Sequence, residues 1–460
     1  MSEFKPDPGR AVSSPVTLPP GLAAVMAGRT VWHVNTTATG GGVAELLDSS
    51  VRLHNDSGIR ARWLVLNGEA EFFTVTKRLH HRLHGSVDEV GSLGEVERKL
   101  YETTTRRQAE EVANWVGVDD ICVLHDPQTL GLAPHLAARG LRVAWRCHIG
   151  TSVASGIVDE TWQFLRPYLR TPEVCGFSVA EYAPPQLRQE DGKVLVLRPS
   201  IDPASRKNRP LAAPAVHELL RAIGLEPPTD GRPTRNTRGA RVLQDDHLPP
   251  DAPMVIQVSR WDPLKDMAGV LEGFATYVAP VRADAHLVLA GPDPADIPDD
   301  PEGAQILHRL REAWQGLPPS TRRRVHVVTL SLTDTDTNAQ VVNALQQRAD
   351  VVLQKSLREG FGLTVTEAMW KGKAIVASAV GGIPAQIRDG IEGLLIRDPH
   401  DFQTFGRAVV QLLEDPALRN KMGEAARRRC ASQFLIDREF LDYCTLYRRI
   451  LSGHRIMEQP

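Results

Sequence analysis

The sequence predicts an α/β protein of two domains, each built on a parallel sheet with helices on both faces. The chain has 460 residues, which is more than one ordinary hydrophobic core organises. Short apolar segments alternate with helix-like segments, and this alternation occurs as two separate sets. Strands that alternate with helices are typical of parallel sheets covered on both faces. The two sets therefore indicate two Rossmann-like domains.

The first set of apolar segments has the pattern of buried strands. A helical pattern follows the first strand, with Val43, Leu46, Leu47 and Val51 on one face, and it ends near Gly58. Strands of the first domain are expected at 30–35, 61–66, 121–126, 142–147, 176–179 and 193–198. Those of the second domain are expected at 254–259, 286–291, 325–330, 350–354 and 374–379.

The domain boundaries follow from these two sets. We expect a flexible N-terminal arm over 1–28, because it is rich in Pro and small residues. The first domain is expected over 29–205, joined by a C-terminal helix at about 436–460 that packs back onto it. The second is expected over 206–435. Within it, 227–253 is crowded with Pro, Gly, Asp and Arg and lacks periodicity, which predicts a mobile surface insertion.

Composition excludes several classes of function. Hydrophobic residues make up 42% and charged residues 24%, as in ordinary soluble domains, and the net charge of −2 lacks the basic surplus of nucleic-acid binders. Apolar stretches fall short of the roughly 18 residues of a membrane span. The N-terminus has prolines where a signal peptide needs an apolar run. Five scattered cysteines without a CxxC pair predict buried thiols. We expect a cytoplasmic protein that binds neither nucleic acid nor membrane.

A glycine-rich turn follows the first predicted strand. Gly40, Gly41 and Gly42 precede a helix that opens at Val43. Glycines let the backbone approach a ligand closely, and a helix start offers unpaired N–H groups to an anion. The alternative is a plain strand-to-helix turn. The full GxGxxG pattern, with the acid that holds a nicotinamide ribose, is missing, which disfavours a dinucleotide-binding dehydrogenase.

Two basic residues follow the predicted strand 254–259. Arg260 and Lys265 lie just past its carboxyl end, where parallel α/β sheets bind their ligands. The planar fork of Arg and the compact charge of Lys together suit a diphosphate. Fixed cations there would also stabilise the negative charge that grows on a leaving group. The alternative is an exposed loop with an Arg260–Asp262 ion pair.

Two glutamates carry the most specific signal in the chain. Glu359 precedes the short turn 360–362, and a helical run from Leu363 carries Glu367. The helix N-terminus can face a diphosphate. At about 1.5 Å rise per helical residue, the carboxylates should lie roughly 10 Å apart. One acid would then bind sugar hydroxyls and the other a ribose. The alternative, a solvated face, suits Glu367 poorly because its neighbours are apolar.

Further polar residues lie at strand ends or in loops. His148 follows the strand 142–147. It would form a hydrogen bond with a hydroxyl of a bound ligand, or else be a structural histidine. His125 and Asp126 end another strand and allow the same two interpretations. Lys77 would reach a phosphate from a helix, or lie on that helix's surface. The DxD sequence at 334–336 matches a metal-binding signature known from a different fold, but its polar loop indicates turn chemistry.

Taken together, these segments resemble the retaining glycosyltransferases of family 4, and within it the trehalose glycosyltransferring synthases. The resemblance covers about residues 30–450, without the arm and 227–253. It implies the GT-B fold, in which two Rossmann-like domains face each other across a cleft. The segments that carry it are VWHVNTTATGGGVAELL, FFTVTKRLHHRLHG, AWRCHIG, RPSIDPASRKN, QVSRWDPLKD and SLREGFGLTVTEAMWKGKAIVASAVGGIPAQI.

The resemblance implies a role for each matching residue. Arg260 and Lys265 match the family's diphosphate-binding pair, and Glu367 matches its ribose-binding acid. His148 matches the cleft histidine near the donor sugar. Glu359 matches the acid that holds the donor-sugar hydroxyls, aided by the backbone amides of Gly360, Phe361, Gly362 and Leu363. Gly41 and Gly42 match the glycine turn over the donor phosphates, and the acceptor side is expected at Asp126, Lys77 and Gly150.

The implied activity is that of a hexosyltransferase. It moves glucose from UDP- or ADP-glucose to free glucose, reversibly and with retention, and forms α,α-trehalose. Front-side attack is implied, with the donor phosphate taking the acceptor's proton and with no cofactor or metal. A homodimer is compatible with this activity. Similar enzymes carry an aspartate where this chain has Gly150, so another sugar or a cyclitol remains an alternative acceptor.

Other functions remain as hypotheses at this point. A retaining trehalose phosphorylase shares the HVNTTATGGGVAE-like segment and would use phosphate in place of a nucleotide. A non-catalytic nucleotide-sugar-binding protein would keep the same polar residues without turnover. An assay of trehalose breakdown, with UDP or ADP in one series and inorganic phosphate in the other, distinguishes a phosphorylase from a nucleotide-dependent synthase. An Arg260→Ala variant with an unchanged biological role would favour the non-catalytic binding protein.

Overall fold

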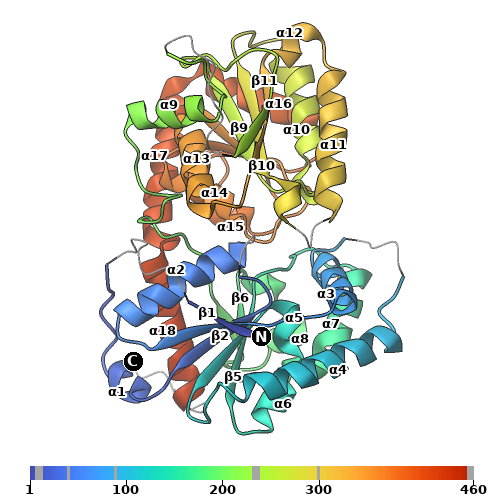
Figure 1. Ribbon diagram of the computed structural model, residues 1–460, viewed down its shortest axis with the longest axis vertical. Coiled ribbons are helices and arrows are strands. Elements are labelled where there is room, and N and C mark those ends of the chain that lie inside the picture. The colour runs from blue at the N-terminus through green and yellow to red at the C-terminus, as the bar shows by residue number, and fades with distance from the viewer. Residues whose placement is uncertain (6–13, 39–41, 87–90, 230–238, 298–300, 453–460) are drawn as a thin grey trace. The chain divides into compact units, whose positions relative to one another are not determined.

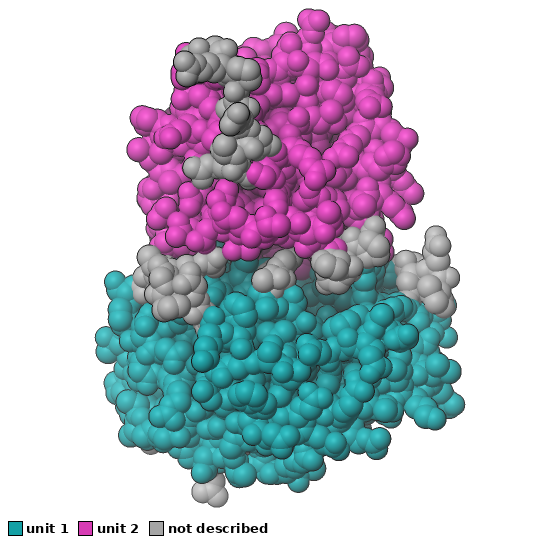
Figure 2. Space-filling model, in the orientation of Figure 1, with its two compact units in different colours: residues 1–202, 434–460 teal, residues 203–433 magenta. Residues whose placement is uncertain are grey.

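The computed structural model describes residues 1–5, 14–38, 42–86, 91–229, 239–297 and 301–452. The chain divides into two compact units (Figure 2), of which unit 1 is Met1–Asp202 with Phe434–Pro460 and unit 2 is Pro203–Gln433. Each unit contains a mostly parallel sheet with helices packed on it (Figure 1). The predicted α/β fold class with two Rossmann-like sheets is confirmed.

The sheet of unit 1 has the order β1-β3-β2-β4-β5-β6-β7 in the described part of the chain, and all neighbours are parallel except β1 and β3. Its strands are β1 Ser2–Phe4, β2 Val31–Asn35, β3 Ala61–Val65, β4 Ile121–His125, β5 Arg142–Cys147, β6 Val174–Phe177 and β7 Val194–Val196. Its helices are α1 Leu22–Met26, α2 Gly42–Asp56, α3 Ala70–Leu83, α4 Glu95–Val112, α5 Asp126–Leu130, α6 Ala133–Ala137, α7 Gly156–Leu169, η1 Ala180–Tyr182, α8 Pro185–Arg188 and α18 Ile436–Ser452.

Alternation along the strands of unit 1 separates two hydrophobic cores, one on each face of the sheet. Trp32 and Trp145 belong to the core that α4 and α7 cover. Val31 and Val123 belong to the other core, which contains Phe440 of α18. Successive strand side chains point to opposite faces, and the central strands are buried on both. Helix α18, red in Figure 1, contacts α2, β5 and β6 and so closes the second face.

The sheet of unit 2 has the order β14-β13-β12-β9-β10-β11-β8 among the described residues, and only β8 and β11 are antiparallel. Its strands are β8 Ala240–Leu243, β9 Met254–Val258, β10 His286–Pro292, β11 Val325–Leu330, β12 Val351–Gln354, β13 Ala374–Ser378 and β14 Leu394–Ile396. Its helices are α9 Ala213–Ala222, η2 Pro263–Lys265, α10 Met267–Gly273, η3 Phe274–Val278, η4 Pro294–Asp296, α11 Pro301–Gln315, α12 Pro319–Arg322, α13 Thr335–Arg348, α14 Leu363–Trp370, α15 Ile383–Gln386, α16 Phe402–Glu414 and α17 Pro416–Gln433.

The expected flexible arm over 1–28 is wrong for two of its segments. Ser2–Phe4 forms β1, which pairs antiparallel with β3. The ring of Phe4 packs on Trp63 at a centroid distance of 4.4 Å, and Leu22 and Met26 of α1 are buried. The edge of the sheet supplies hydrogen bonds to Ser2–Phe4, and the core shared with α18 supplies the apolar surface that covers Leu22 and Met26. Residues 6–13 lie outside the described part of the chain.

The expected mobile insertion over 227–253 is also wrong in its second half. Ala240–Leu243 forms β8, which pairs antiparallel with β11, and Leu248 is buried. The pairing covers the edge of the unit 2 sheet, so main-chain hydrogen bonds order a segment without apolar periodicity. Residues 230–238 of this segment lie outside the described residues.

Two general expectations can be compared with the described residues. All five cysteines are buried as free thiols, as predicted. Among the described helices, none combines the length and apolar character needed to cross a bilayer.

Candidate active site

The central strands β9 and β12 of unit 2 bring Lys265 and Glu359 together. The two strands are parallel neighbours, so the loops that leave their carboxyl ends meet at one edge of the sheet. Lys265 ends the short helix η2 that follows β9, and Glu359 lies in the loop after β12. The Lys265 Nζ lies 2.7 Å from both carboxylate oxygens of Glu359. The side chains are 19% and 8% exposed, so this ion pair is largely shielded from water.

Neutral donors complete the environment of the Glu359 carboxylate. The amide Nε2 of Gln354 donates to its Oε2 at 3.1 Å, and the hydroxyl of Ser356 donates to the same oxygen at 3.2 Å. A carboxylate that accepts several hydrogen bonds is held in one orientation. Glu359 therefore presents a fixed acceptor at this edge of the sheet.

Buried hydrogen bonds tie the two loops to each other. Gln257 of β9 donates through Nε2 to the Lys265 carbonyl at 2.7 Å, and its Oε1 accepts the backbone N–H of Lys355 at 2.8 Å. The N–H of Leu357 donates to the Leu264 carbonyl, also at 2.8 Å. The distance between Lys265 and Glu359 is thus set by the sheet and by backbone contacts, which preorganises the pair.

The start of α14 lies directly after Glu359. Gly362 has φ of +87°, a left-handed conformation that favours glycine, and α14 begins at the next residue. A Cβ on Gly382 would lie 2.8 Å from the Gly360 carbonyl oxygen, so a second loop packs closely against this turn. The first N–H groups of a helix lack intrahelical acceptors, and the helix dipole is positive there. This edge therefore combines a cation, a carboxylate and a helix start.

Glu367 lies one turn farther along α14 and is buried, with 4% of its surface exposed. The amide Nε2 of Gln346 donates to its Oε2 at 3.1 Å, and the Lys207 Nζ lies 3.6 Å from its Oε1. Its neighbours Val365 and Ala368 are buried, as their apolar character predicts. The solvated-face alternative for Glu367 is therefore wrong.

Arg260 has a more open setting than Lys265. Its side chain is 44% exposed, and its Nη2 lies 3.6 Å from the Asp262 Oδ2. This is the ion pair named as the alternative to a binding role. An exposed pair of this length contributes little to stability.

His148 and Asp126 form the corresponding strand-end cluster in unit 1. The His148 backbone N–H donates to the Asp126 Oδ1 at 2.7 Å, and the His148 Nε2 lies 2.9 Å from the His125 Nδ1. Burial, then the nearby Arg146 and His33, lowers the pKa of His148 well below its usual value, so the ring is neutral at neutral pH. Burial also raises the pKa of the Asp126 carboxyl to about 6.

The remaining residues predicted in unit 1 have differing environments. Gly150 has φ of +154°, and a Cβ there would lie 2.6 Å from the ring of the buried Tyr182, so this backbone leaves no room for a side chain. That contact is the physical reason for the glycine. Lys77 is half-buried on α3. Gly42 is the first residue of α2, whereas Gly41 lies outside the described residues.

Several polar partners at the site were not predicted. Gln354 ends β12 and Ser356 follows it, so the strand-end rule could have found both. Gln346 and Lys207 hold Glu367 from α13 and from a loop before α9, and sequence spacing gives no signal for either. The DxD sequence was expected in a polar loop, and the structure places it at a helix start instead. Asp334 is the N-cap of α13, and its Oδ1 accepts the N–H of Asp336 and Thr337 at 3.1 and 3.0 Å.

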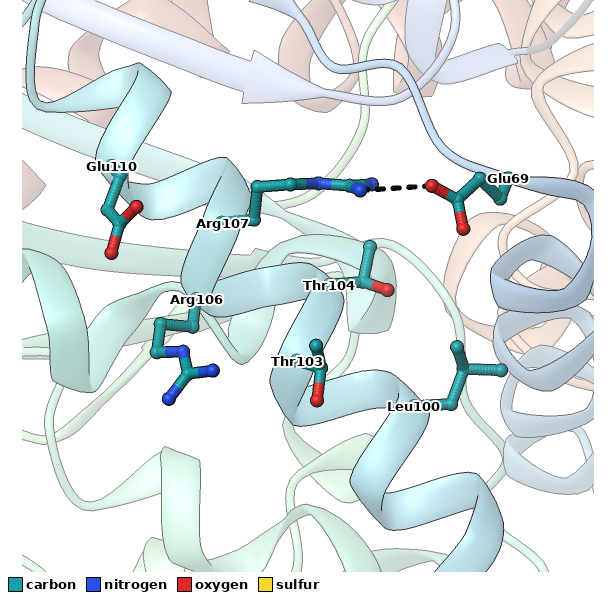
Figure 3. A pocket seen from close by; sticks show the side chains of 7 residues that line it. All are labelled: Glu69, Leu100, Thr103, Thr104, Arg106, Arg107 and Glu110. Atoms are coloured by element: carbon teal, nitrogen blue, oxygen red, sulfur yellow. Dashed lines mark hydrogen bonds and ion pairs between the residues drawn. The ribbon is translucent and has the colours of Figure 1, made fainter.

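A polar hollow of about 380 Å³ lies elsewhere in unit 1, beside α4 (Figure 3). Arg107 reaches across it to Glu69 at 3.0 Å, and Arg106 and Glu110 project from the same helix. The predicted site residues do not line it. Within the described ranges, His, Cys, Asp and Glu side chains form no group of three or more able to hold a metal ion.

Known proteins match both units. Residues 33–184 match the family model described as trehalose synthase, N-terminal domain, and residues 330–429 match that of glycosyl transferases group 1. Trehalose synthase of Pyrococcus horikoshii is 35% identical over 420 residues, which cover 90% of this chain and 89% of that protein. Trehalose synthase of Rubrobacter xylanophilus is 34% identical over 433 residues, covering 94% and 92%.

A solved structure supports the fold. The α,α-trehalose-phosphate synthase (UDP-forming) of Burkholderia vietnamiensis superposes with a TM-score of 0.66 at 15% identity, over 92% of this chain and 98% of that one. At this identity the likeness concerns the fold alone. It confirms a GT-B-like fold, with one Rossmann-like sheet in each unit taken by itself.

Proposed function

Because the chain belongs to the trehalose synthase family of group 1 glycosyltransferases, we propose that it transfers glucose from a nucleoside diphosphate glucose to free glucose and forms α,α-trehalose. The observation that carries this proposal is the shielded Lys265–Glu359 pair at the start of α14. A cation and a helix N-terminus suit a diphosphate, and a fixed carboxylate suits sugar hydroxyls.

Each polar group has a role in holding the donor. Lys265, Arg260 and the first N–H groups of α14 bind the diphosphate, and the backbone amides of Gly360 to Leu363 help Glu359 to hold the donor glucose. Glu359 accepts hydrogen bonds from hydroxyls of the donor glucose, and Glu367 accepts them from the ribose. Gln346 and Lys207 hold the Glu367 carboxylate in place for this role.

The transfer breaks the bond between the anomeric carbon and the β-phosphate oxygen and forms a bond from that carbon to the acceptor hydroxyl oxygen. The acceptor's proton passes to the departing phosphate oxygen on the same face, so the anomeric configuration is retained. Lys265 and Arg260 offset the negative charge that grows on the diphosphate. The same steps in reverse cleave trehalose with a nucleoside diphosphate, and the proposal includes no cofactor.

His148 is the residue of unit 1 that we propose binds a sugar. We assign it a hydrogen bond to a sugar hydroxyl, since a neutral imidazole can donate or accept one without adding charge. Asp126, Gly150 and Lys77 remain the residues proposed for the acceptor side. A Cβ at position 150 would meet the ring of Tyr182, which supports a glycine there.

A product assay tests the proposed function. The protein is incubated with glucose and with UDP-, ADP- or GDP-glucose, and the anomeric signals of the product are followed by NMR. We expect α,α-trehalose and release of the nucleoside diphosphate in equal amounts. Cyclitols and other sugars are offered in parallel as acceptors, and a product formed from them alone would reject glucose as the acceptor.

The reverse reaction separates the competing functions. Trehalose is incubated with UDP or ADP in one series and with inorganic phosphate in another. Breakdown that requires phosphate would identify a phosphorylase and contradict the proposal. Nucleotide-sugar binding without any turnover in either direction would indicate a non-catalytic binding protein.

A further inference from the structure

Three buried histidines form a continuous chain across one face of the unit 1 sheet. The His33 Nδ1 lies 3.0 Å from the His125 Nε2, and the His125 Nδ1 lies 2.9 Å from the His148 Nε2. The rings of His125 and His148 are stacked, with centroids 5.2 Å apart and an interplanar angle of 19°. His148 is the member at the candidate site, and His33 lies deepest in the sheet.

The sheet register explains why the three rings meet. His33 of β2 lies opposite Val123, two residues before His125 of β4. His125 in turn lies opposite Arg146, two residues before His148. Side chains two residues apart share a face, so each histidine lies on the same face and two residues nearer the carboxyl ends of the strands. The chain therefore runs diagonally from the sheet interior to the site.

All three rings are neutral at neutral pH. Burial lowers the pKa of His33, His125 and His148 well below the usual value, and the positive charge of Arg146 lowers the pKa of His125 and His148 further. Arg146 is itself fully buried and donates to the carbonyls of Cys147 and Leu197. A neutral imidazole carries one N–H, so the three rings together carry three protons.

Counting these protons leaves two arrangements. Each of the two ring–ring contacts holds one proton between its nitrogens. The third proton must lie at one end of the chain, on the His33 Nε2 or on the His148 Nδ1. Because each ring keeps a single proton, choosing one end fixes the tautomer of all three histidines.

The environment of His33 decides between the two ends. Its Nε2 is buried and has no hydrogen-bond partner among the residues that the structure describes. The neighbouring rings of His54 and Tyr443 meet it edge to face, with centroids 5.8 and 5.5 Å away. A buried N–H without an acceptor is rarer in proteins than an acceptor without a donor. The third proton is therefore more stable on the His148 Nδ1.

We propose that His33 and His125 are positioning residues that make the Nδ1 of His148 a hydrogen-bond donor toward a sugar hydroxyl. The chain fixes the orientation of the His148 ring and selects its tautomer, and neither His33 nor His125 touches the substrate. The direction toward a sugar rests on the proposed function. The tautomer itself is a property of the protein alone.

Nitrogen NMR of the protein labelled with ¹⁵N-histidine tests the tautomer without any substrate. The His148 signals are assigned from their loss in His148→Gln. We expect the His148 Nδ1 to be protonated and its Nε2 to be an unprotonated acceptor at neutral pH. A protonated Nε2 on His148 in the wild-type protein would overturn the proposal, whether or not the protein forms trehalose.

Kinetics of two His125 variants test the positioning role. His125→Leu removes the hydrogen bond to His148, and we expect kcat to fall on the order of 10- to 100-fold with a smaller change in the KM for the donor. His125→Asn places an amide near the former Nδ1 and should restore kcat to within about fivefold of wild type. Wild-type kcat in His125→Leu, or an equal loss in both variants, would overturn the proposal.

A second stacked pair in unit 2 provides a matched control. His286 and His326 are in contact through ring nitrogens 3.0 Å apart, with centroids separated by 5.3 Å. We expect His326→Leu to lower the melting temperature about as much as His125→Leu does, and to leave kcat unchanged. A similar loss of kcat in this control would mean that destabilisation alone lowers turnover, and the positioning role would be rejected.

Discussion

Removing the ammonium of Lys265 should lower both stability and turnover, by two mechanisms that can be separated. The Lys265 Nζ contacts both oxygens of a Glu359 carboxylate that is only 8% exposed. Breaking a buried ion pair by removing one partner costs about 3–5 kcal/mol. Gln354 and Ser356 still donate to the carboxylate, and Lys265 is partly exposed. For Lys265→Ala we therefore expect a loss of about 2–3 kcal/mol of unfolding free energy.

Turnover should fall for a different reason. Loss of one preorganised group that stabilises charge in the transition state lowers kcat by about 10²–10³. We expect a loss of this size in Lys265→Ala, with a smaller rise in the KM for the donor, because the negative charge on the diphosphate is greatest as it departs. Stability is measured by urea denaturation, and kcat by release of the nucleoside diphosphate.

The double variant Lys265→Ala/Glu359→Gln separates the two mechanisms. Without the carboxylate charge, nothing buried is left unpaired, so stability should return to within about 1 kcal/mol of wild type. Turnover should remain about 10²-fold below that of Glu359→Gln alone, since the cation is still missing. Equal kcat in the double variant and in Glu359→Gln would show that Lys265 acts only through Glu359, and would refute the direct role assigned to it.

Three further predictions follow from other residues. Glu367→Ala should raise the KM for the donor about 10-fold with little change in kcat, and equal effects on both constants would contradict its assignment to the ribose. Asp126 has a folded pKa of about 6, above the unfolded value near 4, so its stabilising contribution is complete below about pH 4 and is lost as the pH rises through 6. Asp126→Asn should accordingly gain about 2–3 kcal/mol relative to wild type between pH 4 and pH 8, and a constant difference in urea denaturation across this range would refute it. Gly150→Ala should lower stability by about 1–3 kcal/mol because its Cβ meets the ring of Tyr182, and an unchanged melting temperature would contradict the close contact.

The central strands of both sheets could be predicted from the sequence because they are buried on both faces. Such strands consist of apolar runs, and β4, β5 and β11 begin where those runs were expected. The strands β1, β8 and β14 were not predicted. Each is three or four residues long and lies at an edge of its sheet, where pairing with one neighbour orders a segment too short to be recognised as a strand from its sequence alone.

The sequence likewise predicted some residues of the candidate site and missed others. The strand-end rule and the family motif located Lys265, Glu359 and His148, since chemistry at a parallel sheet follows from topology. Gln346 contacts Glu367 from another helix, which spacing along the chain cannot indicate. His33 lies within a buried strand, so its pattern is that of a core residue. Its role becomes visible only when the register places it beside His125.

The two units present different chemistry at the ends of their strands, and the proposed ligands explain the difference. A diphosphate carries permanent negative charge, so a unit proposed to bind one needs cations that stay charged. Lys265 retains a carboxylate partner that limits the cost of burying it. A sugar hydroxyl carries no charge. An imidazolium buried in unit 1 would therefore lose its hydration energy without forming an ion pair with the sugar. A chain of neutral imidazoles avoids that penalty and still delivers a directed N–H to the surface of the sheet. Burial of the three histidines therefore favours the proposed role of His148 as a hydrogen-bonding group over a role as a charge.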